Sequence, residues 1–177
     1  EDEQTPIVFY TYYNLMFSGG LEAYIAEAKE AGVDGLLVLD LPPEEAGDYV
    51  EACQKIEMKT VFLLAPTTPE ERVEYIAQNA TGFIYYVSRT GVTGVREDLA
   101  SDLQEMVGMI KRHSDNPLVV GFGIQKPDQV NAVARLADGV VVGSAIVNTI
   151  KENLDDEGKM LERIESLVTS LVGGTQR

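Results

Sequence analysis

Apolar positions along the chain switch repeatedly between two spacings, and the switching predicts strands and helices in turn. Short runs of β-branched, aliphatic or aromatic residues predict six strands, at 6–12, 35–39, 60–64, 82–87, 118–120 and 139–142. Between these runs, apolar residues recur every three or four positions, as at Val130, Val133 and Ala137, and predict amphipathic helices. Strands that alternate with helices form a parallel sheet with right-handed crossovers, buried on both faces.

Polar or glycine-rich sequence follows every predicted strand. It occurs at Asn14, Asp40, Thr67, 89–94, 121–123 and 143–144. A (β/α)8 barrel builds its site from the loops at the carboxyl ends of its strands, so the recurrence favours a barrel over an open doubly wound sheet. A complete barrel usually takes about 250 residues. We therefore expect an incomplete TIM barrel of six β/α units, forming a single domain over residues 1–177.

The last βα unit, residues 117–147, carries the most specific chemistry. Gly121-Phe122-Gly123 ends one strand, and Gly143-Ser144-Ala145 ends the next, with Ser144 placed to cap a short helix. Either turn alone fits a simple chain reversal equally well. Two such turns on neighbouring parallel strands predict a phosphate site, because bare amides and a helix amino end attract anions.

Composition excludes several other classes of function. With 45% hydrophobic residues the chain has enough apolar content for a core, and its net charge of −15 argues against nucleic acid or an anionic membrane surface as a partner. Cys53 is the only cysteine and sits at an apolar helical position, so neither a disulfide nor a zinc cluster is expected. No apolar run approaches the roughly 20 residues of a membrane span, and no metal-ligand constellation is visible.

Several segments together identify a family resemblance. YTYYNLMF, AKEAGVDGLLVLDLPPEEA, FIYYVSRTGVTG, VVGFGI and GVVVGSAIV occur in this order. In order and spacing they closely resemble the α subunit of tryptophan synthase, a (β/α)8 barrel, from the family's third strand to its C-terminus. Other phosphate-binding barrels share the last two segments in looser form, but not SRTGVTG.

The resemblance implies a lyase of tryptophan biosynthesis, which is a branch of aromatic amino acid biosynthesis. It also implies a location in the cytoplasm or the plastid stroma. The family cleaves indole-3-glycerol phosphate to indole and glyceraldehyde 3-phosphate by a retro-aldol reaction, with no cofactor in this subunit. By motif position, Tyr85 would lie beside the substrate and Thr93 on a loop that closes the site. The residues implied to hold the phosphate are Gly94, Phe122, Gly123, Gly143 and Ser144.

The resemblance also implies a protein partner. Asn14, Leu15, Phe17, Asp40 and Pro42 match positions at which the family meets its β subunit, which contains pyridoxal phosphate. Asp40 has a second interpretation as a catalytic acid, because it follows a strand's carboxyl end.

One departure limits the expected activity. The family's acid/base glutamate lies on its second strand, and the aspartate that pairs with the indole N–H lies in the following loop. Neither is in these 177 residues, so no catalytic residue is assigned and we expect no useful turnover. One alternative is a non-catalytic fragment or binding module that keeps the β-subunit surface and the predicted phosphate site at 121–123 and 143–145, called the phosphate cup. The other is another phosphate-binding barrel enzyme that uses Asp40.

Overall fold

The computed structural model describes residues 5–88, 97–121 and 123–175, with the side chains of 97–102 left out. All six predicted strands are confirmed: β1 Val8–Thr11, β2 Gly35–Val38, β3 Lys59–Leu64, β4 Ile84–Val87, β5 Leu118–Gly121 and β6 Gly139–Val141. Their order in the sheet follows the chain, β1-β2-β3-β4-β5-β6. The pairs β1–β2, β2–β3 and β5–β6 are parallel, as expected for strands joined through helices.

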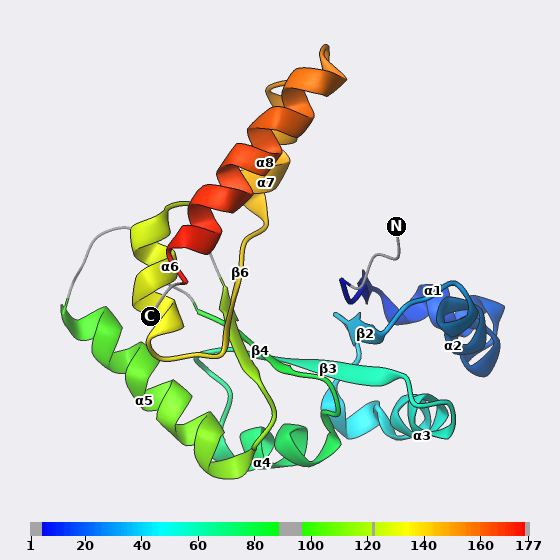
Figure 1. Cartoon of the computed structure of the whole chain (residues 1–177). Coiled ribbons are helices and arrows are strands. Elements are labelled where there is room, and N and C mark those ends of the chain that lie inside the picture. The colour runs from blue at the N-terminus through cyan, green and yellow to red at the C-terminus, as the bar shows by residue number, and fades with distance from the viewer. Residues whose placement is uncertain (1–4, 89–96, 122, 176–177) are drawn as a thin grey trace. The chain divides into compact units, whose positions relative to one another are not determined.

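The helices follow the predicted alternation (Figure 1). They are α1 Tyr13–Gly19, α2 Leu21–Glu30, α3 Gly47–Lys55 after the short 3-10 helix η1 Pro43–Glu45, α4 Glu70–Asn79, α5 Glu97–His113, α6 Pro127–Ala134, α7 Ser144–Lys151 and α8 Glu157–Gly173. Within the part of the chain that the structure describes, no helix is long and apolar enough to cross a membrane.

Contacts divide the chain into two compact units. The first comprises 1–64, 68–85 and 113–116, and the second comprises 65–67, 86–112 and 117–177. The expected single domain over 1–177 stays a prediction.

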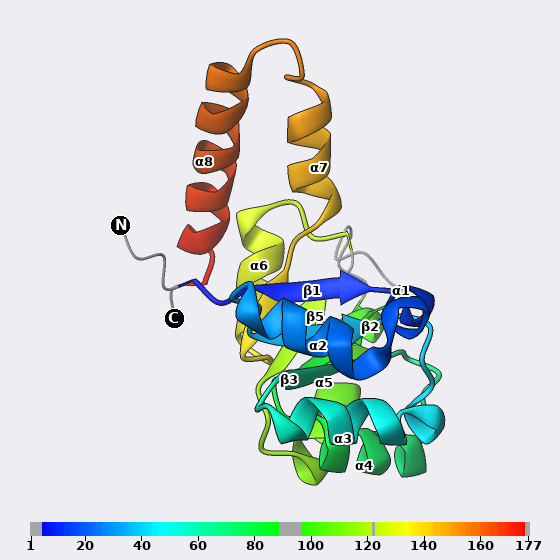
Figure 2. The ribbon, with the colours of Figure 1, turned by 90° about the vertical axis from the view of Figure 1, so that its right-hand side faces the viewer.

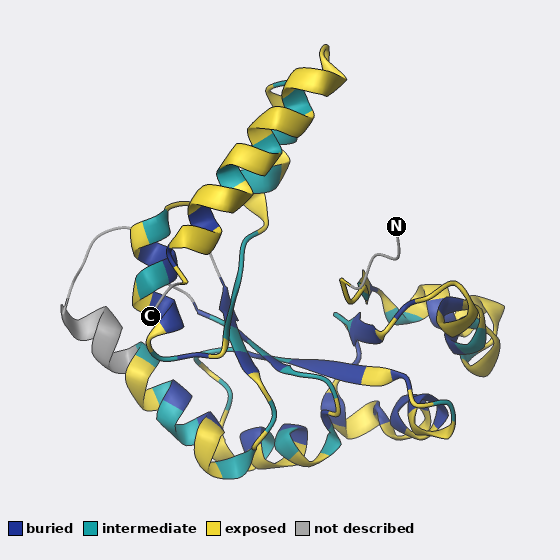
Figure 3. Ribbon diagram, viewed as in Figure 1, coloured by how far each residue is buried: buried dark blue, intermediate teal, exposed yellow. Residues whose placement is uncertain are grey.

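The core of the first unit lies between its strands and the helices α2, α3 and α4, where the strand and inner helix surfaces are buried (Figure 3). Tyr49 of α3 packs edge-on against Phe62 of β3, with ring centroids 6.5 Å apart, and its hydroxyl donates to the Leu36 carbonyl oxygen at 2.9 Å. Cys53, one turn later on α3, is fully buried. Burial raises the pKa of the Cys53 thiol to about 12, so this cysteine is a core residue and not a nucleophile.

The second unit ends in a helical hairpin. After β6 the chain forms α7 and α8, which run side by side in opposite directions (Figure 2). α7 contains no buried residue, and Leu171 is the only residue of α8 classed as buried. Several apolar side chains of this hairpin therefore remain exposed, including Val147, Leu154, Leu161, Val168 and Val172.

Two local predictions need correction. The sequence predicted no helix directly after the first strand, but Tyr13–Gly19 forms helix α1. Ser144 was expected to cap the helix after β6, whereas Gly143 is the N-cap and Ser144 is the first helical residue. The sequence reading missed α1 because it spans only seven residues and buries only Met16, so it has almost no amphipathic repeat.

Candidate functional site

The loop after β5 is fixed at both of its ends. Before the loop, the Ser88 amide N–H donates to the Gly121 carbonyl oxygen at 3.2 Å, which joins the end of β4 to the last residue of β5. Within the loop, Gly123 has a φ of 67°, a left-handed conformation that favours glycine. After it, Ile124 is 2% exposed and anchors the turn in the core. The main chain of Gly123 is therefore held in a defined position.

Gln129 of α6 stabilises the same loop through hydrogen bonds. Its side-chain oxygen accepts hydrogen bonds from the amide N–H groups of Gln125 at 2.8 Å and Lys126 at 3.0 Å, and the residue is only 7% exposed. Sequence reasoning missed this residue. The available signal was its position, since Gln129 stands three residues after the N-cap Lys126, where a capping box places glutamine.

The loop after β6 turns directly into a helix amino end. Gly143 is the N-cap of α7, and its carbonyl oxygen accepts hydrogen bonds from the amides of Ile146 and Val147. The N–H groups of Ser144 and Ala145 precede these and belong to the first turn, which has no partner within a helix. Gly143 and Ser144 are both exposed. The positive end of the α7 dipole and the Ser144 hydroxyl thus face solvent beside the end of β6, an arrangement that attracts anions.

The two loops follow neighbouring strands. β5 and β6 pair in parallel, with Val119 opposite Gly139 and Gly121 opposite Val141. Their carboxyl ends therefore lie at the same edge of the sheet, and the predicted phosphate residues Gly123, Gly143 and Ser144 all belong to the second unit. Phe122, Thr93 and Gly94 lie outside the described residues.

Tyr85 belongs to the first unit and lies on β4, where Ile84 and Tyr86 are buried and Tyr85 and Val87 are only partly so. This alternation places Tyr85 on the less covered face of the strand. Burial raises the pKa of the Tyr85 phenol, and the nearby Tyr10 of β1 raises it further, so the hydroxyl is neutral and available as a hydrogen-bond donor. Sequence reasoning had not singled out Tyr10.

The predicted partner residues gather on two adjoining segments of the first unit. Asn14, Leu15 and Phe17 lie on α1, and Asp40 and Pro42 lie in the loop after β2, and all five are exposed. Leu15 and Phe17 are 55% and 71% exposed, which is high for apolar side chains. The two segments are directly connected, because the Asp40 carboxylate accepts a hydrogen bond from the Tyr13 amide N–H at 2.7 Å.

A polar groove of about 460 Å³ lies between α7 and α8 of the second unit. Its lining comprises Thr149, Glu152, Asn153, Lys159, Arg163, Ser166, Leu167 and Ser170, none of which is a predicted site residue. Among the described residues, no group of three or more histidine, cysteine, aspartate or glutamate side chains is arranged to hold a metal ion.

Comparison with known proteins gives one consistent result. Residues 1–175 match the model of the family described as tryptophan synthase alpha chain. The tryptophan synthase alpha chain of Opitutus terrae is 55% identical over 177 residues, which is 100% of this chain and 66% of that protein. That of Geotalea uraniireducens is 44% identical over 99% of this chain and 65% of its own length.

Solved structures agree on the fold. A chain of the Pyrococcus furiosus tryptophan synthase α2β2 complex superimposes with a TM-score of 0.86 at 41% identity, covering 97% of this chain and 68% of that one. The alpha subunit of Legionella pneumophila tryptophan synthase gives 0.86 at 35% identity, covering 98% and 64%. The expected TIM-barrel fold class is thereby confirmed, and the chain spans about two thirds of the length of the relatives that it matches.

Proposed function

The chain belongs to the tryptophan synthase alpha chain family, a family of lyases, and we propose that it carries the phosphate-binding and partner-binding part of the enzyme that cleaves indole-3-glycerol phosphate to indole and glyceraldehyde 3-phosphate. The observation that carries the proposal is the pair of loops after β5 and β6. A left-handed glycine at Gly123 and the open amino end of α7 at Gly143 and Ser144 follow adjacent parallel strands. Both offer main-chain donors to an anion.

A phosphate ester fits these donors better than a carboxylate does. The first-turn N–H groups of α7, the Ser144 hydroxyl and the main chain of Gly123 supply several donors from different directions, and a phosphate has three terminal oxygens to accept them. Ser144 is already fixed through α7, and Gln129 holds the amides of Gln125 and Lys126, which follow Gly123 by two and three residues, so little reorganisation accompanies binding. Gly94 and Phe122 would add further main-chain contacts, by family resemblance.

By family resemblance, Tyr85 would lie beside the substrate. A neutral phenol there donates a hydrogen bond to a substrate oxygen without placing a charge beside the indole. Thr93 would act on the loop that closes over the bound substrate and excludes water, also by family resemblance.

Cleavage itself needs proton transfer, to the indole ring and from the glycerol hydroxyl. The family's acid/base glutamate and the aspartate that pairs with the indole N–H are not among the 177 residues, and a positioned acid or base typically contributes about 10² to 10⁴-fold. By itself the 177-residue chain would then act as a binding module. We assign Asp40 no part in these steps, and its Oδ1 atom accepts a hydrogen bond from the Tyr13 amide N–H.

The proposed partner is the β subunit of tryptophan synthase, whose pyridoxal phosphate site receives the indole. The exposed apolar side chains of Leu15 and Phe17, next to the exposed Pro42, support a protein contact there. The Pyrococcus furiosus relative was solved as an α2β2 complex.

Calorimetric titration of the 177-residue chain with indole-3-glycerol phosphate tests the phosphate cup. Ser144→Ala removes one hydroxyl donor and should weaken binding roughly tenfold, the usual cost of a hydrogen bond to a charged group. Ser166→Ala, on α8 and outside the cup, is the matched control and should leave binding unchanged. No binding by the unsubstituted chain, or equal binding by the Ser144 variant, would refute the cup.

An assay for indole release tests the catalytic statement separately. The unsubstituted chain is expected to release no indole above the uncatalysed rate. Release at a rate comparable to a full-length relative would show that the absent glutamate is dispensable.

A further inference from the structure

We propose that Asp40 is a positioning residue: its carboxylate caps helix α1 from the loop after β2 and so fixes the two segments of the partner surface as one body. The inference rests on the proposed function for the identity of the partner, but the geometry on which it depends lies wholly within the first unit. It assigns Asp40 a role inside the chain, in place of a direct contact with the partner or a part in catalysis.

Helix α1 lacks a cap of its own. Its N-cap residue is Tyr12, whose side chain makes no capping hydrogen bond, and its first turn contains no acidic residue. The amide N–H groups of a first turn need partners from elsewhere, and the helix dipole favours a negative charge near them. A seven-residue helix in water is too short to be stable without such support.

Asp40 supplies both the acceptor and the charge. Its Oδ1 atom lies 2.7 Å from the amide nitrogen of Tyr13, the first residue of α1, although the two residues are 27 positions apart in the chain. The amide N–H of the preceding residue, Leu39, also donates to the Thr11 carbonyl oxygen at 3.0 Å. The loop after β2 therefore holds the end of β1 through Leu39 and the start of α1 through Asp40.

This attachment sets where the partner surface points. Leu15 and Phe17 lie within the next turn of α1, so their directions follow from where the helix starts, while the buried Met16 holds the opposite face against the first unit. The Phe17 ring is further held by Tyr13, with ring centroids 6.0 Å apart. Pro42, two residues beyond Asp40, lies on the same loop. Without the Asp40 carboxylate, α1 loses its direct bond to this loop, so the two segments of the surface are no longer fixed to each other at that point.

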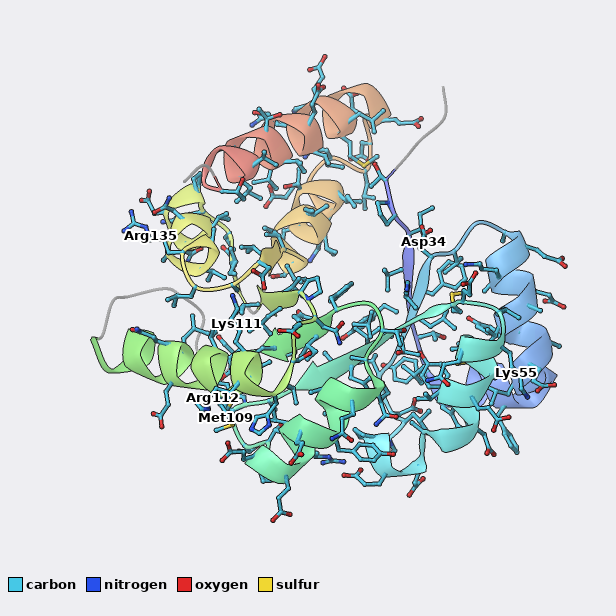
Figure 4. The ribbon with its side chains drawn as sticks, turned by 60° about the horizontal axis from the view of Figure 1, so that its bottom comes forward. Asp34, Lys55, Met109, Lys111, Arg112 and Arg135 are labelled. Atoms are coloured by element: carbon cyan, nitrogen blue, oxygen red, sulfur yellow. The ribbon has the colours of Figure 1, made fainter. Side chains whose placement is uncertain are left out.

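Asp34 offers a matched control from the same strand pair. Its Oδ2 atom accepts a hydrogen bond from the Ile7 amide at 2.8 Å, again across 27 residues, but it stands at the start of β2 (Figure 4). Removing this carboxylate costs a comparable hydrogen bond at the end of the strands away from α1. Global destabilisation is therefore common to both variants, and loss of docking is expected only for Asp40.

The experiment measures binding of the 177-residue chain to the β subunit of the Pyrococcus furiosus complex, by calorimetry or anisotropy. Asp40→Ala should raise the Kd roughly tenfold, the size expected when one helix cap is lost, and Asp34→Ala should leave it within about twofold. Amide hydrogen exchange of the free chain supplies a second readout. Protection across Asn14 to Phe17 should fall in the Asp40 variant and persist in the Asp34 variant.

A second pair of variants separates positioning from direct contact. Tyr13→Pro removes the N–H donor but leaves the Asp40 charge in place, and proline is tolerated at a first helical position after an extended residue such as Tyr12. Tyr13→Ala keeps the donor and loses only the ring, so it is the reference for Tyr13→Pro. Relative to it, Tyr13→Pro should weaken docking as much as Asp40→Ala does, and the double variant should add nothing further.

The possible outcomes decide the inference. Weak docking of Asp40→Ala with normal docking and normal α1 protection in Tyr13→Pro would mean that Asp40 touches the partner directly, and would overturn the positioning role. Equal weakening by Asp34→Ala would reduce the effect to general stability and overturn it as well. If the unsubstituted chain does not bind the β subunit, the proposed partner fails and the docking role fails with it, whereas exchange protection still decides whether Asp40 holds α1.

Discussion

The strand pairs β1–β2 and β5–β6 begin in the same way and end differently. At the start of β2, Asp34 accepts a hydrogen bond from the Ile7 amide through its side chain and donates its own N–H to the Ile7 carbonyl oxygen. At the start of β6, Asp138 makes the same two bonds to Leu118, at 3.0 and 2.8 Å. A glycine follows each aspartate, Gly35 in one pair and Gly139 in the other. A Cβ at either position would lie 3.2 Å or less from an atom of a neighbouring strand, so a side chain there would be crowded.

The carboxyl ends of the same pairs serve different purposes. After β2, one carboxylate oxygen of Asp40 accepts a hydrogen bond from the amide N–H of Tyr13, within the chain. After β5 and β6, glycines carry the chain onward, and the main-chain donors of the first α7 turn remain open to solvent. In the proposed function, such a parallel pair provides stability at its amino end, while its carboxyl end serves either a protein partner or a ligand.

The largest expected effect is a loss of stability at high pH, caused by the buried Cys53 and Tyr49 in the core of the first unit. Burial raises the pKa of Cys53 to about 12 and raises that of Tyr49 as well. Above pH 9 the unfolded chain releases the thiol proton while the folded chain keeps it, so stability falls as pH rises toward 12. One such group contributes up to about 1.4 kcal/mol per pH unit. Urea unfolding between pH 8 and 11, followed by circular dichroism, should show a shallower loss for Cys53→Ala; identical slopes would contradict the assignment.

The next effect concerns the loop after β5. Gln129→Leu leaves the Gln125 and Lys126 amides without their acceptor in a partly buried site and should cost about 2–3 kcal/mol of unfolding free energy. Binding of indole-3-glycerol phosphate should weaken as well, since Gly123 loses its support. Gln125→Ala is the control, because only the main chain of Gln125 takes part. Unchanged ligand binding in Gln129→Leu would separate this loop from the cup.

A pair of glycine substitutions compares the two ends of β6 directly. A Cβ added at Gly139 would lie 2.8 Å from the Cγ1 of Val119, whereas one added at Gly143 would meet nothing within 4 Å. Gly139→Ala should therefore cost about 1–2 kcal/mol through overpacking, and Gly143→Ala should change stability by less than about 0.5 kcal/mol. Thermal unfolding of both variants measures the difference. Similar costs at both positions would remove the proposed distinction between the two ends.

The smallest effect tests the likeness of the two amino ends. Asp34→Ala and Asp138→Ala should each lower unfolding free energy by about 1 kcal/mol, because both carboxylates are exposed and solvent screens their bonds. The ion pair of Asp138 with Lys111 of α5 (Figure 4), at 3.4 Å and largely exposed, should add little to this. Asparagine at either position keeps an acceptor and should recover part of the loss. A clear difference in unfolding free energy between the two alanine variants would show that Asp34 and Asp138 are not equivalent.

Sequence reasoning recovered the repeating part of the molecule well. Each predicted strand is present within a few residues, because a buried parallel strand needs a continuous apolar run, and such runs are visible in one dimension. The placement of Gly123, Gly143 and Ser144 at carboxyl ends followed for the same reason. Sequence reasoning missed helix α1 for a further reason. Its first amide donates to Asp40, which is far away in the chain, and it has no local side-chain cap.

By itself, the sequence determined the strand–helix alternation, the turns that follow each strand and the family to which the chain belongs, because periodicity and glycine position are local properties. Tertiary structure alone decided that Asp34, Asp40 and Asp138 act as acceptors for amides 20 to 27 residues away. An aspartate after a strand looks the same in sequence whether it caps a helix, donates a proton or faces solvent. Only the folded chain brings a particular N–H to it and fixes which of these it does.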